Sequence, residues 1–287
     1  MSPSHARTHT PATYDSGVTE TPVERHPPIL RVDNPRPGVR RLTLNRPEKR
    51  NALDNELRTA LFDALRDADV DDAVHVTVLR GAGPCFSSGY DLDSDLSADR
   101  PSYTPAGEGS WPRQATEGWL SLWDLAKPVI AQVHGYAMAG GSELAAACDL
   151  VYLADDATIS HPVLRVAGTP DFAVHPWLVG LRNAMEMVLT GDAVTADEAV
   201  RAGYANRTFP AEELDEAVLA VAERMAGIPH ELLQLNKRWV YRAMDAMGAR
   251  TAIRSAVDLG SLAQKAPGVQ RNLADLRDRI RGAAAGD

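Results

Sequence analysis

The sequence predicts a mixed α/β protein with a parallel sheet and a helical C-terminal extension. Over the first two-thirds of the chain, short runs rich in β-branched residues alternate with segments whose apolar residues recur every three or four positions. Such alternation is typical of parallel strands that are joined by helices. Beyond residue 210 only the helical spacing remains. We therefore expect layers of sheet and helix, followed by an all-helical region.

The segment from residue 39 to residue 79 is expected to form two strands around one helix. The strands cover 39–45 and 74–79, which are rich in valine and leucine. Between them, apolar residues at helical spacing from Leu53 to Ala68 predict an amphipathic helix, whose N-cap is Asn51 or Asp54.

The stretch KPVIAQVHGYAMAGGSELAAACDLVYLA, at 127–154, combines a strand, a glycine-bearing turn, a short helix and a second strand. The strands are expected at 129–133 and 150–154, and the helix from Ser142 onward. The first amides of a helix have no intrahelical acceptor and lie at the positive end of its dipole. A turn at Gly140 would therefore present N–H groups to an approaching oxyanion.

Glu143 lies in the first turn of this expected helix, among alanine, methionine, glycine, leucine and cysteine residues. An acid at this position either complements the helix dipole or serves the chemistry of a site. A buried carboxylate is costly in apolar surroundings, which gives the second interpretation as much weight as the first.

A second small-residue turn, CFSSGYDL at 85–92, follows the strand at 74–79 and also exposes backbone amides. It is not a dinucleotide fingerprint, because Phe86 stands where the third glycine is required. Residues 93–118 are polar and contain Pro and Gly, so a loop or lid is expected there. Trp119 and Trp123, one helical turn apart, are expected to pack in the core.

Composition excludes several classes of function. The formal net charge of −9 argues against a general nucleic-acid role, which needs a basic surface. No run of 18 uncharged apolar residues is present, so no membrane span is expected. Cys85 and Cys148 are too few for a disulfide framework and lack metal-site spacing, which fits a reducing cytoplasm. Residues 1–28 lack the apolar region of a secretory signal and are expected to form a disordered tail.

Four separated stretches, in this order along the chain, resemble the crotonase family, which is the enoyl-CoA hydratase/isomerase superfamily. They are LTLNRPEKRNAL at 42–53, VTVLRGAGPCFSSGYDL at 76–92, KPVIAQVHGYAMAGGSELAAACDL at 127–150 and AMEMVLTGDAVTADEAVRAGYANRTFP at 184–210. The resemblance implies a crotonase-like spiral of ββα units over residues 29–210. It also implies a helical region at 211–287 that makes trimer contacts, giving a homotrimer or a dimer of trimers.

The same resemblance implies a coenzyme A thioester as the substrate, with no further cofactor, as in fatty acid metabolism. The thioester oxygen would accept hydrogen bonds from the backbone amides of Tyr90 and Gly140, which stabilises an enolate. Tyr90 stands where the family often has a small residue, so its ring changes the expected shape of the pocket. The phosphates of coenzyme A would lie near a cluster of polar and basic residues, namely Arg46, Lys49, Arg50 and Ser88.

The expected reaction depends on the carboxylates. Family hydratases hold a water molecule with two glutamates; Glu143 matches the first, but Val163 stands at the second position. A single carboxylate suffices for a Δ3,Δ2-enoyl-CoA isomerase, which moves a proton between two carbons. Hydration would need a substitute, for which Asp171 is preferred over two histidines expected to be structural, His161 and His175.

Three functions remain in order of preference at this point. The first is an enzyme of the enoyl-CoA hydratase/isomerase type with Glu143 as the general acid/base. The second is a C–C bond hydrolase or lyase that uses the same oxyanion hole. The third is a non-catalytic acyl-CoA-binding paralogue, which the valine at position 163 would explain.

Overall fold

The computed structural model describes residues 28–94, 110–166 and 168–284. Its main sheet has six strands in the order β1-β2-β3-β4-β6-β9, and every neighbouring pair is parallel except β1 with β2. The predicted parallel α/β architecture is therefore confirmed. The strands of this sheet are β1 Leu30–Arg36, β2 Gly38–Leu44, β3 Val74–Gly81, β4 Val129–Val133, β6 Leu150–Ala154 and β9 Arg207–Phe209.

A second sheet of three short strands lies next to the turns that the sequence singles out. Its strands are β5 Tyr136–Met138, β7 Thr158–Ser160 and β8 Val194–Thr195, in the order β5-β7-β8. The segment after β7 contains a 3-10 turn, η2, at Pro162–Arg165. Because β5 pairs with β7, the chain around residue 160 returns to the glycine turn that follows β5.

Three helices surround the site. Helix α1, Asn55–Val70, begins at the N-cap Asp54, whose side chain accepts a hydrogen bond from the Leu57 amide at 2.8 Å. Helix α3, Gly140–Ala147, is buried along its whole length. Helix α2, Ser110–Asp124, shows that the predicted loop is wrong for 110–118. The rest of that loop, 95–109, lies outside the described residues, as does the predicted tail apart from Pro28.

Helix α2 forms because one of its faces is strongly apolar. Ala115, Trp119 and Trp123 are buried, and Leu120 and Leu122 lie beside them. The sequence prediction gave too much weight to the glycine at 118, whose missing side chain lets the ring of Phe62 approach; a Cβ there would lie 2.9 Å from the ring.

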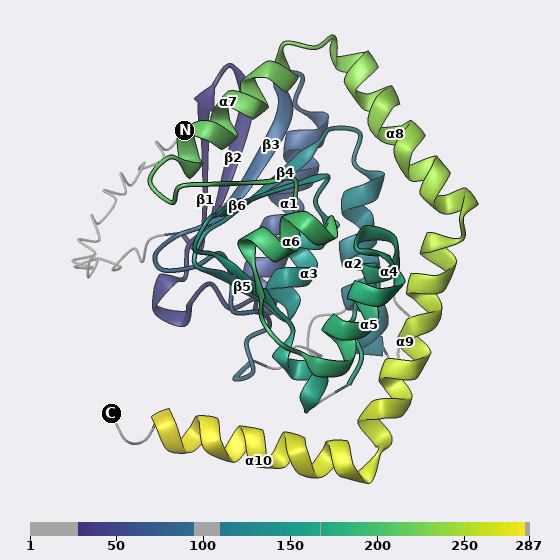
Figure 1. The fold of residues 1–287 in the computed structure, drawn as a ribbon. Coiled ribbons are helices and arrows are strands. Elements are labelled where there is room, and N and C mark those ends of the chain that lie inside the picture. The colour runs from purple at the N-terminus through teal and green to yellow at the C-terminus, as the bar shows by residue number, and fades with distance from the viewer. Residues whose placement is uncertain (1–27, 95–109, 167, 285–287) are drawn as a thin grey trace, which may run out of the picture.

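The C-terminal part of the chain is helical, as predicted. From residue 211 on it comprises α7 Leu214–Ala226, α8 His230–Ala246, α9 Ala249–Lys265 and α10 Pro267–Ala284. Three shorter helices precede it, namely α4 His175–Leu178, α5 Gly180–Thr190 and α6 Ala196–Ala202. Helix α7 packs on the main sheet, whereas α8 and α9 follow one side of the molecule, and α10 turns at the end of α9 and runs below the rest of the fold in this view (Figure 1). Among the described residues, no helix is both long enough and apolar enough to cross a bilayer.

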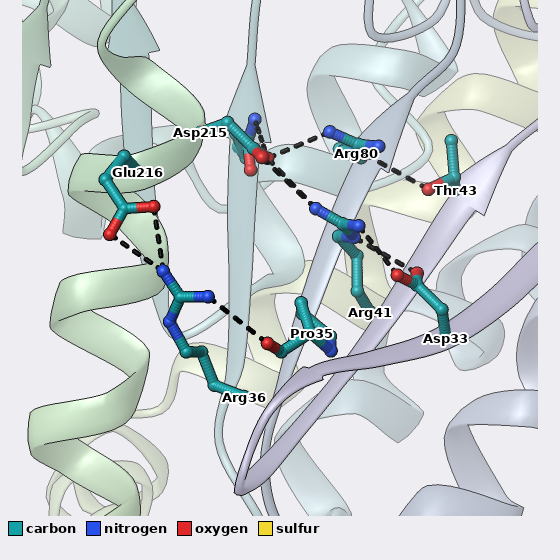
Figure 2. A network of polar contacts seen from close by, with 9 residues as sticks. Asp33, Pro35, Arg36, Arg41, Thr43, Arg80, Asp215 and Glu216 are labelled. Atoms are coloured by element: carbon teal, nitrogen blue, oxygen red, sulfur yellow. Dashed lines mark hydrogen bonds and ion pairs between the residues drawn. The ribbon is translucent and has the colours of Figure 1, made fainter.

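An ionic network fixes α7 on the sheet (Figure 2). Asp215, in the first turn of α7, accepts hydrogen bonds from Arg80 of β3 at 2.8 Å and from Arg41 of β2 at 3.2 Å. Gln132 of β4 donates to the same carboxylate at 3.2 Å, and Arg41 also pairs with Asp33 of β1 at 2.6 Å. Asp215 therefore joins helix α7 to three strands of the sheet. Its negative charge is also favoured by the dipole at the N-terminus of the helix.

Candidate active site

Two backbone turns meet at the N-terminus of α3. The first, which contains Gly89, is joined to β5 by the hydrogen bond from the Met138 amide to the Ser87 carbonyl at 3.0 Å. Gly89 has a φ of 95°, and a Cβ on it would lie only 2.8 Å from the Met138 carbonyl and 3.1 Å from the Gly140 nitrogen. Glycine alone permits this approach. The fold thus brings the predicted pair, Tyr90 and Gly140, to one place.

Ala139 directs the second turn. Its φ of 45° and ψ of −122° belong to a region that glycine prefers, so the alanine stores backbone strain of roughly 1–3 kcal/mol. The amide of Ala139 donates a hydrogen bond to the Ser160 carbonyl at 2.9 Å. The carbonyl of Ala139 accepts a hydrogen bond from the Ser142 hydroxyl at 2.7 Å. Within the described residues, the Tyr90 and Gly140 amides donate to no backbone or side-chain acceptor.

The ring of Tyr90 lies directly over Gly140. A Cβ on Gly140 would come within 2.8 Å of the ring, so the glycine leaves the space that the aromatic side chain fills. The hydroxyl of Tyr90 then reaches Glu143 Oε2 at 3.3 Å. The sequence indicated a ring at this position, and the structure shows that it forms one wall of the site next to the acid.

Glu143 is almost fully buried, with 2 % of its surface exposed. Its Oε2 atom accepts from Trp119 Nε1 at 3.2 Å, and its Oε1 atom accepts from the Asp171 amide at 2.8 Å. Burial, and then the nearby charge of Asp171, raise the pKa of Glu143 well above its usual range. The raised pKa favours the protonated form, and the hydrogen bonds from Trp119 and Asp171 hold the carboxyl in a fixed orientation, as a general acid requires.

Asp171 supplies a second carboxyl to the same site. Burial raises its pKa from 3.8 to about 7, although the charge of Arg58 and a hydrogen bond with Tyr90 act in the opposite direction. The two carboxyls differ in environment: the pKa of Glu143 is raised well above its usual range, whereas that of Asp171 is about 7. The pair can donate and accept protons within one reaction, and the structure brings both predicted acids together.

The two candidate histidines are neutral at pH 7. Burial lowers the pKa of His161 to about 3 and that of His175 to about 4. His161 Nδ1 lies 3.3 Å from the Ser142 hydroxyl, and its Nε2 lies 3.5 Å from Glu143 Oε1. Their rings are 6.5 Å apart and nearly perpendicular. No group of three or more His, Cys, Asp or Glu side chains in the described part of the chain is arranged to hold a metal.

Two residues of the site were missed in the sequence. Trp119 was assigned only to the core, yet its indole N–H donates to Glu143; the signal for this was that a buried indole needs an acceptor. Arg58 lies on the buried face of α1 and is only 5 % exposed. A basic residue within an otherwise apolar helix face was the signal for its special position.

The residues expected to hold coenzyme A are placed differently from one another. Arg46 is paired with Asp54 and Asp91, each at 3.0 Å, so its charge is used within the chain. Lys49 is half-exposed and pairs with Asp93 at 3.2 Å. The Ser88 amide donates to the Arg50 carbonyl at 3.0 Å, which joins these two positions. Val163, at the position of the second hydratase glutamate, lies in η2.

Comparison with known proteins gives a consistent family. A family model described as enoyl-CoA hydratase/isomerase matches residues 35–266. The chain is 37% identical over 235 residues to the putative enoyl-CoA hydratase EchA13 of Mycobacterium tuberculosis, covering 74% of this chain and 73% of that protein. It is 35% identical over 210 residues to the mitochondrial enoyl-CoA hydratase domain-containing protein 3 of Danio rerio, covering 70% and 69%.

Solved structures agree with these relatives. An enoyl-CoA hydratase/isomerase from Xanthobacter autotrophicus Py2 superposes with a TM-score of 0.80 at 33% identity, over 90% of this chain and 96% of that one. A monofunctional enoyl-CoA isomerase from M. smegmatis superposes with a TM-score of 0.64 at 33% identity, over 76% and 94%. The similarity therefore covers both the core and much of the helical region.

Proposed function

Because the chain belongs to the enoyl-CoA hydratase/isomerase family, we propose that it binds an acyl-CoA thioester and moves protons on the acyl chain. The observation that carries this proposal is the buried acid Glu143, which shares its site with a second acid, Asp171. Both lie at the turn where the Tyr90 and Gly140 amides have no acceptor within the described residues. Enolate chemistry requires an acid/base beside two N–H donors, and the second acid extends the possible reactions to hydration.

The oxyanion hole is the first element of the proposed mechanism. The amides of Tyr90 and Gly140 donate to the thioester oxygen as it gains negative charge in the enolate. The strained turn at Ala139 sets the direction of one of these donors before substrate arrives. Loss of one donor in such a hole typically costs roughly 10²–10³ in rate.

The two carboxyls perform the proton transfers. In isomerisation, a carboxylate removes a proton from C2 of a 3-enoyl-CoA, the electrons move into the dienolate, and the proton returns at C4. In hydration, the water oxygen attacks C3 of the enoyl chain while the carboxylate of Asp171 takes a proton from that water. The acid Glu143 then delivers a proton to C2. Asp171 thereby takes the role of the glutamate that Val163 replaces. Both reactions are redox-neutral and need no cofactor besides the coenzyme A of the substrate.

The proposal also covers the oligomeric state, the cellular compartment and the metabolic context. We place the chain in a homotrimer or a dimer of trimers, because α8 and α9 expose large apolar side chains such as Leu235, Trp239 and Leu262 at 65%, 71% and 68%. Such exposure is typical of a surface that a partner covers. The cysteines Cys85 and Cys148 are free thiols, which suits the cytoplasm, and the substrate class suits fatty acid metabolism.

The deciding experiment uses two substrates in deuterated water. Crotonyl-CoA and its 3-enoyl isomer are incubated with the protein, and the acyl-CoA products are read by mass spectrometry. Gain of deuterium together with oxygen indicates hydration, and gain of deuterium without oxygen indicates isomerisation. Glu143→Gln, which is nearly isosteric, must abolish either product. Equal turnover by that variant, or no product from a range of enoyl-CoA chain lengths, would contradict the proposal.

A further inference from the structure

Arg58 is a buried cation whose Nε atom has no oxygen acceptor within the described part of the chain. Its side chain projects from the first turns of α1 with only 5 % of the residue exposed. Its Nε atom is fully covered and has no hydrogen-bond partner among the described residues. Leaving a charged donor buried and unpaired costs considerably more than burying an apolar side chain. A bound ligand that supplies an oxygen acceptor would satisfy this donor.

The guanidinium of Arg58 lies at the aromatic wall of the site. Its Cζ atom is 4.7 Å from the ring centre of Trp111 and 5.9 Å from that of Tyr90. These two rings meet edge to face at 5.1 Å. Aromatic faces stabilise a cation, but they accept none of its in-plane N–H hydrogen bonds. The ring contacts therefore leave the Nε donor unsatisfied.

Tyr90 links this cation to the reacting groups. Its ring covers Gly140, and its hydroxyl reaches Glu143 Oε2. The charge of Arg58 also acts on the carboxyl of Asp171, which places the cation within electrostatic range of the acid pair. Arg58 thus contacts the same tyrosine whose ring covers Gly140 and whose hydroxyl reaches the acid.

We propose that the preferred acyl-CoA carries a carboxylate on its acyl chain and that Arg58 binds this carboxylate. This inference rests on the proposed function, because it assigns a substrate class to the same site. A carboxylate matches the planar guanidinium with two parallel hydrogen bonds, one of which would satisfy Nε.

Selectivity follows from the burial. A chain that ends in a methyl group would leave the donors of Arg58 unpaired in a closed site, which penalises the neutral ligand. Arg58 is then a specificity-determining residue, while Glu143 and Asp171 remain the groups that move protons.

The test measures binding, so that it does not depend on turnover. Succinyl-CoA, glutaryl-CoA and adipyl-CoA are titrated calorimetrically, each against the neutral acyl-CoA of equal carbon number, namely butyryl-CoA, valeryl-CoA and hexanoyl-CoA. In at least one pair we expect the carboxylate to bind roughly ten- to hundredfold more tightly. Arg58→Met should remove this preference while it retains binding of the neutral member. Arg58→Lys keeps the positive charge but cannot donate the two parallel hydrogen bonds of a guanidinium, so it should retain part of the preference.

A matched control is Arg66→Met, an exposed arginine on the same helix that pairs with Asp63. It should leave the preference unchanged. Equal affinity within every pair for the wild-type protein would overturn the inference while leaving the proposed function intact. Equal weakening of both members by Arg58→Met would assign Arg58 a structural role instead and would also overturn it. If no acyl-CoA binds at all, the proposed function itself fails.

Discussion

The indole nitrogen of Trp119 lies 3.2 Å from Glu143 Oε2 and 3.1 Å from the hydroxyl oxygen of Tyr90. One N–H group is thereby shared between the acid of the site and the residue whose ring covers Gly140. The indole belongs to α2, whereas Glu143 belongs to α3, so the packing of two helices fixes the direction of the carboxyl. Trp119 is a positioning residue, because it acts through Glu143.

Replacement of Trp119 by phenylalanine should keep the packing and remove the donor. The indole hydrogen bond lowers the pKa of Glu143, so its loss should raise that pKa further. We expect kcat to fall about tenfold, as for the loss of one hydrogen bond to an ionisable group, and the basic limb of the pH profile to move to higher pH. Trp123→Phe, one turn later in α2, is the control, and an unchanged pH profile in Trp119→Phe would contradict this role.

The pKa of Asp171 leads to a second prediction, on stability. Its pKa is raised in the folded state from 3.8 to about 7, so between these values the folded protein binds a proton that the unfolded chain has lost. The contribution of Asp171 to the free energy of unfolding is therefore fully present below about pH 4 and is lost as the pH rises to about 7. In Asp171→Asn this loss is absent, so its free energy of unfolding relative to the wild type should increase over that range by roughly 3–4 kcal/mol, because each pKa unit corresponds to about 1.4 kcal/mol.

Urea unfolding of both proteins at several pH values checks this difference. His161 and His175 have lowered pKa values and contribute the opposite dependence, with stability that falls as the pH decreases through their range. Because both proteins contain these histidines, their contribution cancels in the comparison. Parallel stability curves for wild type and Asp171→Asn would show that Asp171 ionises normally in the folded protein.

Much of the architecture follows from local patterns in the sequence. The strands at 129–133 and 150–154 were predicted with the bounds that the structure has, because both are short, mainly apolar runs bounded by polar residues or proline. The N-cap at Asp54 and the capping box from Thr195 to Glu198 are likewise local. Glu143 was selected as a candidate site residue because a carboxylate is unusual among the apolar residues that surround it in the sequence.

The remaining features depend on contacts between distant segments. The amide of Asp171 bonds to Glu143 only because the chain returns beside β5 through β7, 28 residues after the acid. No period or spacing encodes that return. The spacing of Trp119 on α2 indicated packing alone, and Arg58 on α1 was not singled out by the apolar pattern of its helix. Helix α2 was missed at its beginning because the polar residues before Trp119 resemble a loop when their buried neighbours are unknown.

The contact between Gly140 and Tyr90 gives a third prediction. A methyl group at position 140 would overlap the Tyr90 ring, so Gly140→Ala should destabilise the protein by about 1–3 kcal/mol and disturb the neighbouring amide. Tyr90→Ala removes the ring and should restore most of that stability in the double variant. Thermal unfolding of both single variants and the double variant measures the coupling. Additive effects would show that the ring is not what limits position 140.

The basic cluster expected at the coenzyme A gives a fourth prediction, because its members have different surroundings. Arg46 pairs with Asp54 Oδ2 while the Oδ1 atom of the same residue caps α1, and it also pairs with Asp91, whose side chain is 7% exposed. Arg46→Met leaves these carboxylates without their cation, so we expect a loss of about 3 kcal/mol in the free energy of unfolding.

Lys49, unlike Arg46, forms its ion pair at the surface: its partner is Asp93, and both side chains are more than half exposed. Lys49→Ala should therefore leave the midpoint of unfolding almost unchanged. If Lys49 contacts the phosphates, the KM for acyl-CoA should rise severalfold, and the rise should shrink as ionic strength increases because salt screens exposed charges. A KM that does not change at low salt would remove Lys49 from the phosphate site and leave Arg50 as the basic residue to test there.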